Sequence, residues 1–557
     1  LHKPIRKCVK PLGIVCIVWT TSTMIVSFPW CLPDNGREPW KPLGRPQTVP
    51  MCCSWQVAAF WLTRPERMQE CSVCNRPGKQ RTKESACTNK PKHATSWPRP
   101  WRFLARKWPD RKDLITVLRP EYVWYGDDFT GASDTLATLS QGGVTAILLL
   151  QAPGPQHLKK LRGMEAIGLA GATRSLDCEH IRSTLKAVTP FLASLQPKLL
   201  HYKICSTFDS SPEIGNIALA LECLRPLAQV AVSPVLGGQV NLGRYCVFAT
   251  LFAQAGQDGQ VYRIDRHPTM GSHPVTPMSE ADLQLHLQAQ GLRNVSSLPW
   301  TEYRKPNYKA DKQSLQWQEQ ARDHGHLHPL LDIACEQDIE YAGELLNELS
   351  RHGTVLTAGS SSVAQAYLSQ RRKTSGEAAA GLPRSAQPVL LLVGSQSPVT
   401  ARQVDHCQQA DTFELDPAEL HYSPSYAAEL HAIVIDNMRK GRHTLLRTKT
   451  ANQDRTRPAL PAQRVAEDSA QFLRHLVKQL RLEQRLSRLC IAGGDTSSLS
   501  TQALGIWGLS YLGLVCPGVA ACLCHGDDEI DGLQLVLKGG QMGPEDFFDR
   551  VIEGTSC

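Results

Sequence analysis

Two adjacent carboxylates close a short apolar stretch. The pattern over 121–125 predicts a β-strand, and Asp127 and Asp128 follow it almost directly. Like charges held this close raise each other's pKa, so such a pair is costly unless it holds and deprotonates a hydroxyl or binds a cation. A helical pattern over 132–140 comes next, and Asp128 and Thr130 also suit a helix cap. Spacing alone therefore leaves capping and catalysis open.

Single cations close two further apolar stretches. Lys203 lies near the end of the run 199–204, where burying an ammonium without a partner is costly. Asp209 is one candidate partner, and the alternative is that both residues face an anionic ligand. Arg174 follows the run 166–170 and is suited to clamp a carboxylate through two hydrogen bonds. For each of these residues an ordinary surface charge is the competing interpretation.

Glycine-rich turns follow predicted strands in the last third of the chain. They lie at 394–397, 493–498 and 538–543. Backbone N–H groups in such a turn, together with the N-terminus of the next helix, can hold a phosphate. One turn alone is weak support, because glycine between a strand and a helix usually meets a conformational need. Three turns in one domain indicate a nucleotide site.

The segment 262–278 is dense in His, Arg and Asp, among them Arg266 and His267. It has no metal-ligand spacing. Its prolines predict a rigid, ordered loop, and such loops are often functional. The competing interpretation is a solvated loop whose histidines are satisfied locally.

The elements that position these residues alternate between strands, polar turns and helices. This alternation predicts the α/β class, with parallel strands and ligands bound beyond their carboxyl ends. Residues 371–388 lack a pattern and have the composition of a linker. We therefore expect two α/β domains, 119–370 and 389–557. Neither domain contains an apolar run long enough to cross a membrane.

The charge of the chain separates these domains from the residues before them. The net charge is +9, yet residues 1–118 hold 21 Lys+Arg and 7 Asp+Glu, while the remainder holds 40 and 45. The same leader holds 8 of the 12 Trp and 8 of the 19 Cys. Its frequent prolines disfavour sustained helix or strand. We interpret the leader as disordered or non-native, that is, an upstream reading frame translated with the protein.

Three functional interpretations of the leader compete with that view. A basic flank before the uncharged run 11–33 is typical of a targeting segment. Cys71, Cys74, Cys87 and His93 approach the spacing of a zinc finger, although the intervening residues offer almost no apolar core. The basic charge could bind polyanions, but charge alone is unspecific. No nucleic acid is expected as a partner, and no membrane unless 11–33 is a targeting segment.

Taken together, these residues resemble the four-carbon acid sugar kinase family, most closely its 3-oxo-tetronate kinases. The resemblance covers residues 119–555. It rests on Asp-Asp-Phe-Thr-Gly-Ala-Ser-Asp at 127–134, on the stretch 201–215, on the loop 265–278, and on the turns at 493–497 and 538–548. It implies a sugar-acid-binding domain followed by a nucleotide-binding domain, with a catalytic cleft between them. It also implies transfer of the ATP γ-phosphoryl group to the 4-hydroxyl of a four-carbon acid, with Mg²⁺ bridging the phosphates.

The resemblance also implies roles for individual residues. Asp127 or Asp128 would hold or deprotonate the attacking hydroxyl. The substrate would be bound by Arg174, Lys203, Ser206, Asp209, Arg266 and His267. ATP would be bound by Ser395, Ser397, Gly493, Gly494, Asp495, Thr496, Gly539 and Gly540.

Some positions depart from the family pattern, above all Gly540 and Met542 in the turn after Lys538. A relative that binds sugar acid or nucleotide without transferring phosphate is therefore a second hypothesis. A polyanion- or zinc-binding protein acting through the leader is a third. The cysteines outside the leader are scattered, as expected for a reducing cytoplasm. We expect a cytoplasmic enzyme and allow for a homo-oligomer.

Overall fold

The structure is a computed structural model that describes residues 18–20, 23–25, 118–255, 259–272, 276–371, 381–449, 460–526, 528–540 and 542–555. In the leader, β1 (Val18–Thr20) and β2 (Thr23–Ile25) pair in antiparallel fashion. They belong to a unit of residues 1–89, which is separate from the unit of residues 90–557. The proposed zinc ligands and most of the proposed targeting run lie outside the described residues.

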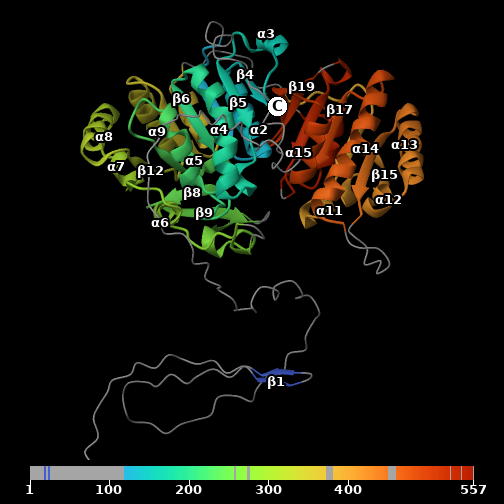
Figure 1. The fold of residues 1–557 in the computed structure, drawn as a ribbon, viewed down its shortest axis with the longest axis horizontal. Helices are drawn as coiled ribbons and strands as arrows, with labels where there is room; N and C mark the ends of the chain where they lie inside the picture. The colour runs from blue at the N-terminus through green and yellow to red at the C-terminus, as the bar shows by residue number, and fades with distance from the viewer. Residues whose placement is uncertain are drawn as a thin grey trace, which may run out of the picture. The chain divides into compact units, whose positions relative to one another are not determined.

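A parallel sheet lies at the centre of the N-terminal domain, coloured cyan to yellow in Figure 1. From one edge to the other, its strands are β4 (Ala146–Leu149), β5 (Ala166–Ala170), β3 (Tyr122–Gly126), β6 (Leu199–Lys203), β13 (Val355–Gly359), β7 (Val235–Gln239), β12 (His328–Asp332) and β11 (Val295–Leu298). The register pairs Gly126 with both Ala170 and Lys203. The carboxyl ends of β5, β3 and β6 therefore meet at one edge of the sheet.

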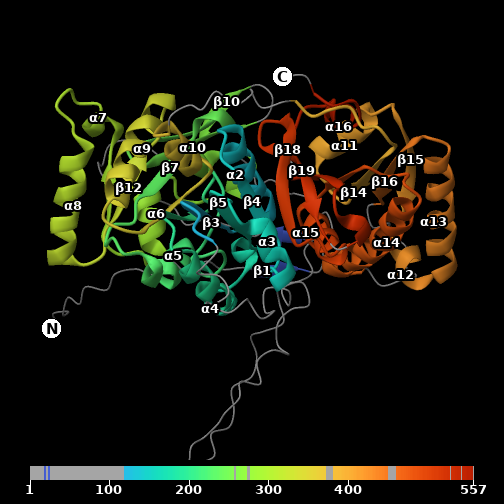
Figure 2. The ribbon, with the colours of Figure 1, turned by 90° about the horizontal axis from the view of Figure 1, so that it is seen from above.

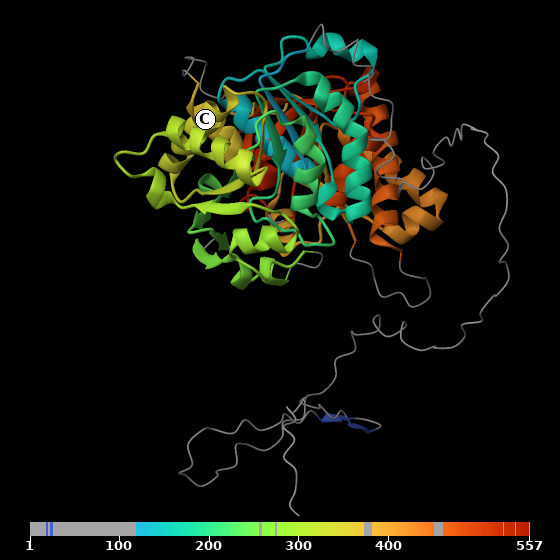
Figure 3. The ribbon, with the colours of Figure 1, turned by 60° about the vertical axis from the view of Figure 1, so that its left-hand side comes forward.

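Helices cover both faces of this sheet, because successive side chains of a strand point to opposite faces. Tyr122 and Trp124 pack on the face that carries α2 (Phe129–Gln141), α9 (Glu336–Ser350) and α10 (Ser362–Ser369). Val123 and Tyr125 pack on the face that carries α4 (Cys178–Leu195) and α5 (Ile217–Leu224). Figure 3 shows helices on either side of these strands. The remaining helices of this domain are α3 (Leu158–Leu161), α6 (Leu283–Ala289), α7 (Trp300–Tyr303) and α8 (Ala310–His324).

A small antiparallel sheet branches from β7. The chain passes through the short helix η6 (Val240–Leu242) into β8 (Arg244–Val247), β9 (Thr250–Ala255) and β10 (Gln260–Arg263). The hairpin between β8 and β9 places Phe248 and Ala249 at positive φ. The buried Asp332 carboxylate accepts hydrogen bonds from both of their backbone N–H groups, at 2.6 and 2.9 Å, and so holds the turn.

The C-terminal domain, coloured orange to red, repeats the layered arrangement. Its sheet contains β15 (Ala410–Leu415), β16 (His443–Thr448), β14 (Val389–Val393), β17 (Arg488–Ala492) and β20 (Gln534–Lys538) in parallel, then β19 (Val519–His525) and β18 (Gly508–Cys516) in antiparallel fashion. Its helices are α11 (Pro398–His406), α12 (Pro417–Tyr422), α13 (Pro424–Arg439), α14 (Ala462–Leu482), α15 (Gly494–Ala503) and α16 (Phe547–Glu553).

The side chains of β14 show how the layers of this domain form. Leu390 and Leu392 pack with the cluster that includes α13 and α14, whereas Leu391 and Val393 pack with the cluster that includes α11 and α16. Figure 2 shows these helix pairs on opposite sides of the strands. A strand buried on both faces needs a continuous apolar sequence, which is why 389–393 contains only Val and Leu.

The two sheets are joined edge to edge by hydrogen bonds. β18 pairs with β4 in antiparallel fashion, with Gly508 opposite Leu149. The C-terminal part of the expected linker is also packed, since Leu382 is only 1% exposed and its backbone N–H donates to Thr555 Oγ1 at 2.9 Å. The α/β class is confirmed, whereas the antiparallel branch after β7 and the β18–β19 hairpin were not expected. Among the described helices, none is both long and apolar enough to span a bilayer.

Candidate active site

The carboxyl ends of β3, β5 and β6 bring together three of the residues singled out in the sequence. Asp127 follows β3, Arg174 lies in the short helix η4 (Thr173–Ser175) after β5, and Lys203 ends β6. The backbone fixes this arrangement: Asp127 N donates to Lys203 O at 2.9 Å, and Arg174 N donates to Asp127 O at 3.1 Å.

Arg174 binds both aspartates. Its Nη2 lies 3.1 Å from Asp127 Oδ1 and 2.6 Å from Asp128 Oδ1, and its Nε lies 3.3 Å from Asp127 Oδ2. Asp128 is also the N-cap of α2, because its Oδ1 accepts a hydrogen bond from Gly131 N at 2.9 Å. The capping and functional interpretations of Asp128 are therefore compatible.

The electrostatics of this pair are unequal. Burial raises the pKa of Asp127 to about 6; Arg174 opposes the rise and the neighbouring charge of Asp128 adds to it. Burial also disfavours the charged Arg174, but Asp127 and Asp128 outweigh it and hold the pKa of the guanidinium well above its usual value. Arg174 therefore stabilises the charge of both carboxylates, but for Asp127 burial outweighs this effect.

Lys203 lies against the same turn. Its side chain is only 3% exposed, and its Nζ donates to Ile204 O at 2.8 Å. A Cβ added at Gly131 would lie 2.6 Å from this Nζ and 2.5 Å from Asp128 Oδ1. The absence of a side chain at Gly131 thus allows an ammonium and a carboxylate to approach the start of α2 together.

The turn after β6 supplies a third carboxylate. Asp209 Oδ1 accepts a hydrogen bond from Thr207 Oγ1 at 2.7 Å, and Thr207 Oγ1 also contacts Cys205 Sγ at 3.0 Å. Burial works to raise the pKa of Asp209, but the charge of Arg174 and these hydrogen bonds lower it overall. Ser206 is buried in the same turn. The structure thus brings Asp209 to the Arg174 cluster, and Ser206 lies in the same turn as Asp209.

The loop 262–278 is ordered by His267, within the part of it that the structure describes. His267 is 7% exposed, and its Nδ1 accepts hydrogen bonds from the N–H groups of Thr269 and Met270, both at 3.2 Å. Its Nε2 lies 3.4 Å from Gln254 O, so the ring is neutral and bridges the loop to β9. Arg266 is exposed. These contacts account for the order of the loop and leave substrate binding by both residues a prediction.

The glycine turns of the C-terminal domain converge beyond the carboxyl ends of β14, β17 and β20. Gly394 and Ser395 N–H groups both donate to Ala492 O, and Gly493 N donates to Lys538 O at 3.0 Å. Gly493 has a φ of 130°, which favours glycine, and it caps α15. Gly494 has open space where a side chain would be, at the first turn of that helix. An anion can therefore approach the backbone N–H groups of the first turn of α15.

The predicted serines order the neighbouring turn. Ser395 Oγ accepts a hydrogen bond from Ser397 N, and Ser397 Oγ caps α11 through Val399 N, both at 3.2 Å. A Cβ at Gly540 would lie 2.8 Å from Ser395 Oγ, so glycine lets the two turns meet. Thr496 is 7% exposed and packs beside Gly394, whereas the side chain of Asp495 lies outside the described residues.

The sequence did not reveal the side chains that hold the turn 539–543. Lys538 is fully buried, and its Nζ donates to Thr400 Oγ1 at 2.9 Å and to Gly539 O at 3.1 Å. Burial lowers the pKa of Lys538 to about 8. Gln403 Nε2 donates to the carbonyls of Met542, Gly543 and Pro544. The hydrogen bonds from Lys538 and Gln403 therefore hold the backbone of the turn in place.

Residues of the N-terminal domain flank this turn. A Cβ at Gly539 would lie 3.3 Å from Met542 Cγ and 4.0 Å from Thr130 Cγ2, and Thr130 belongs to the first turn of α2. A Cβ at Gly518 would lie 2.5 Å from Met542 Cε and 3.6 Å from Leu242 Cδ2. The aspartate turn at 127–131 therefore adjoins the candidate nucleotide turn, and Leu242 of η6 lies beside Gly518, which Met542 of that turn also adjoins.

Comparisons with known proteins agree with this division. A family profile described as a sugar-binding N-terminal domain matches residues 122–367, and one described as a nucleotide-binding C-terminal domain matches residues 390–548. A relative from Paraburkholderia graminis, named 3-oxo-isoapionate kinase, is 34% identical over 452 residues, which is 77% of this chain and 94% of the relative. The chain belongs to the four-carbon acid sugar kinase family.

Other family members support the same conclusion. A 3-oxo-tetronate kinase from Pectobacterium atrosepticum is 29% identical over 76% of this chain and 97% of its own length. A solved structure from Salmonella typhimurium LT2 shares the fold, with a TM-score of 0.61 at 23% identity over 78% of this chain and 98% of its own. A Haemophilus influenzae structure has a TM-score of 0.58 at 22% identity, covering 77% and 98%. The fold and the order of the two domains are thus those of the family.

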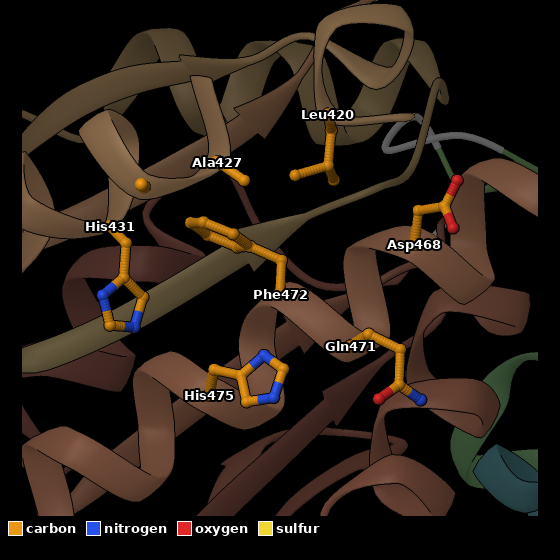
Figure 4. Close-up of a pocket in the computed structure, with 8 residues that line it drawn as sticks. Leu420, Ala427, His431, Asp468, Gln471, Phe472 and His475 are labelled. Carbon is orange, nitrogen blue, oxygen red and sulfur yellow. The ribbon is translucent and has the colours of Figure 1, made fainter. Parts of the chain in front are cut away.

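A separate hollow lies among the outer helices of the C-terminal domain (Figure 4). It has a volume of about 370 Å³ and is lined by residues of α12, α13 and α14, including His431, Phe472 and His475. None of the residues predicted from the sequence lines it. The catalytic assignment therefore stays with the aspartate turn and the glycine turns.

The residues present fit a magnesium ion bound mainly by nucleotide. Within the described ranges, no group of three or more His, Cys, Asp or Glu side chains forms a metal site. Mg²⁺ in phosphotransfer sites takes one or two protein carboxylates and otherwise phosphate and water oxygens. Asp127 and Asp128 are the carboxylates that the Thr130 contact brings to the turn 539–543.

Proposed function

We propose that the protein transfers the γ-phosphoryl group of ATP to the terminal hydroxyl of 3-oxo-tetronate, giving 3-oxo-tetronate 4-phosphate. The observation that carries this proposal is the position of Thr130, which follows the paired aspartates and adjoins the glycine turn at 539. A hydroxyl held by the aspartates would lie beside a phosphate held by that turn. Such positioning, with charge stabilisation, supplies most of the catalysis in phosphoryl transfer.

The geometry favours different roles for the two aspartates. Asp128 is 25% exposed and Asp127 is 6% exposed. We therefore assign the contact with the attacking hydroxyl to Asp128, and assign to Asp127 the orientation of Arg174. Arg174 and Lys203 supply positive charge where the hydroxyl and the phosphoryl group meet. We therefore assign them this role in place of binding the substrate carboxylate, which was the role expected from the sequence.

The nucleotide roles follow from the C-terminal turns. The N–H groups at the start of α15 and the turn at 539–540 would contact the phosphates, with Ser395 and Ser397 holding the adjacent turn in place. Mg²⁺ would neutralise phosphate charge during transfer. Lys538, Thr400 and Gln403 act through the backbone of the turn and are positioning residues.

A second candidate substrate is 3-oxo-isoapionate. It is favoured by the identity of 34% to the relative named for that activity, against 29% to the Pectobacterium atrosepticum 3-oxo-tetronate kinase. The two candidates share the 3-oxo acid group and the phosphoryl transfer. They differ in the acid that the N-terminal domain accepts.

The test is ADP release by the full chain with ATP, Mg²⁺ and each acid in turn, with Asp128→Asn as the control for contaminating kinases. We expect ADP release that depends on a 3-oxo acid and is lost in the variant. The ratio of kcat/KM values for the two acids then chooses between them. Nucleotide binding without ADP release on either acid would support the non-catalytic hypothesis instead.

A further inference from the structure

Arg244 lies at the first position of β8, close to the catalytic edge of the N-terminal domain. It is directly opposite Gln239 in the antiparallel pair, so the two side chains share a face of the sheet. Gln239 Nε2 donates to Asp134 on α2 at 3.2 Å, which identifies that face as the α2 side. Leu242, two residues earlier, and Met542 of the nucleotide turn both lie beside Gly518. Arg244 is thus close to α2 and two residues from a neighbour of Gly518, which also adjoins the nucleotide turn.

The guanidinium of Arg244 is incompletely paired. One terminal nitrogen donates to Leu242 O, but Nε is buried without a hydrogen-bond partner, and no carboxylate of the described chain lies within ion-pair distance. The buried Arg488 shows the contrast. It also lacks a carboxylate, yet it donates to Gln534 Oε1, Val551 O and Pro383 O. A buried donor without an acceptor costs free energy unless a ligand supplies one.

The titratable groups around Arg244 link it to the aspartate cluster. They are Cys205, Tyr245 and His267. Burial lowers the pKa of Arg244, while Cys205 and Tyr245 work to raise it. The same Cys205 thiol is within electrostatic range of Arg174. Arg244 and the Arg174 cluster therefore both lie near Cys205.

The net charge of the aspartate cluster leaves no cation there for the carboxylate of an acid substrate. Arg174 and Lys203 bring two positive charges, while Asp127, Asp128 and Asp209 bring three negative charges. A substrate carboxylate at that point would be repelled by the net negative charge, so the acid needs a further cation elsewhere in the site. Arg244 is partly buried and cationic, and its buried Nε is a free donor; these are the properties that carboxylate recognition needs.

We propose that Arg244 binds the carboxylate of the sugar-acid substrate, so that the acid lies with its carboxylate at β8 and its reacting hydroxyl at the aspartate turn. This inference rests on the proposed kinase function. It names the residue that selects acids over neutral sugars. Arg244 keeps this role for either 3-oxo acid, because both carry the same group.

The test compares wild type, Arg244→Gln and Arg244→Lys, using 3-oxo-tetronate, 3-oxo-isoapionate and their carboxamides. For the acid that wild type phosphorylates, we expect Arg244→Gln to raise KM by roughly 30-fold or more and to change KM for ATP less than about twofold. Arg244→Lys should restore part of the loss. The carboxamide should be a poor substrate for wild type and suffer little further loss in Arg244→Gln. Arg351→Gln removes a charge from an exposed site on the same domain and serves as the control.

Equal losses for acid and carboxamide, or a rise in KM for ATP instead, would overturn the proposal. Thermal melting tests whether Arg244 has a structural role instead. We expect Arg244→Gln to melt no lower than wild type, because the substitution removes a partly buried cation whose Nε has no hydrogen-bond partner. If wild type fails to phosphorylate any acid, the kinase proposal fails. Calorimetric titration with the same acids then decides the Arg244 proposal: binding lost only in Arg244→Gln supports it, and equal binding or none overturns it.

Discussion

Replacing Asp127 with Asn should make the protein more stable and much less active. Burial raises the pKa of Asp127 to about 6, from an ordinary value of 3.8. Ionising this carboxylate in the folded protein therefore costs about 3 kcal/mol relative to the unfolded chain. Asn resembles the protonated acid in shape and removes that cost. It also removes the charge that orients Arg174, so we expect kcat/KM to fall by roughly 100-fold.

The sign of the pH dependence follows from the direction of the shift. Between about pH 4 and pH 6 the folded protein binds more protons at Asp127 than the unfolded chain, so stability conferred by the protonated group is lost as pH rises. The free energy of unfolding of Asp127→Asn should match wild type near pH 4. It should exceed wild type by about 3 kcal/mol near pH 7, at roughly 1.4 kcal/mol per pH unit in between.

The assay is urea unfolding followed by circular dichroism and tryptophan fluorescence at several pH values. Trp124 is fully buried in the same strand, three residues before Asp127, and reports on this domain. Asp128→Asn is the matched control, because Asn also caps helices and Asp127 still titrates. A variant Asp127→Asn that is less stable than wild type near pH 7, or whose difference from wild type is independent of pH, would refute the reasoning.

Three further predictions concern the nucleotide turn and the scaffold. Lys538→Met removes the donor to Thr400 and Gly539, so KM for ATP should rise roughly 10-fold with KM for the acid unchanged in steady-state kinetics; an unchanged KM for ATP would contradict this. Gly540→Ala places a Cβ 2.8 Å from Ser395 Oγ and should also raise KM for ATP, with Ser395→Gly in the same chain relieving part of the loss. Gln196 ends α4 in the left-handed region at a φ of 45° and is exposed, so Gln196→Gly should stabilise by about 1 kcal/mol in urea unfolding without affecting turnover, whereas Gln196→Ala should not stabilise.

Some of the site could be predicted because it depends on local patterns. Apolar runs at 166–170 and 199–204 identified buried parallel strands, and the carboxyl ends of parallel strands lie at one edge. Arg174 and Lys203 were therefore expected near the paired aspartates. The ion pairs of Arg174 with Asp127 and Asp128 could not be predicted. Contacts across the strand ends depend on the register of the strands, which the apolar runs alone do not fix.

Other parts of the site depend on contacts between distant residues. Lys538 reaches Thr400, 138 residues earlier in the chain. Lys538 begins one of the predicted glycine turns, but nothing in the sequence pairs it with Thr400, which stands in no such pattern. Arg244 lies in a short antiparallel branch, and its strand β8 is too short and too mixed in polarity to be predicted from the sequence. The proposal for Arg244 rests on a buried Nε that has no hydrogen-bond acceptor, and a sequence does not show which donors lack an acceptor.

The most direct test of the central claim is the product of the reaction. ³¹P NMR of the full chain with ATP, Mg²⁺ and 3-oxo-tetronate or 3-oxo-isoapionate should show ADP and, in equal amount, a phosphomonoester on the terminal carbon of the acid. Asp128→Asn should form neither. ADP with inorganic phosphate alone, or ADP formation that does not depend on the acid, would contradict the account.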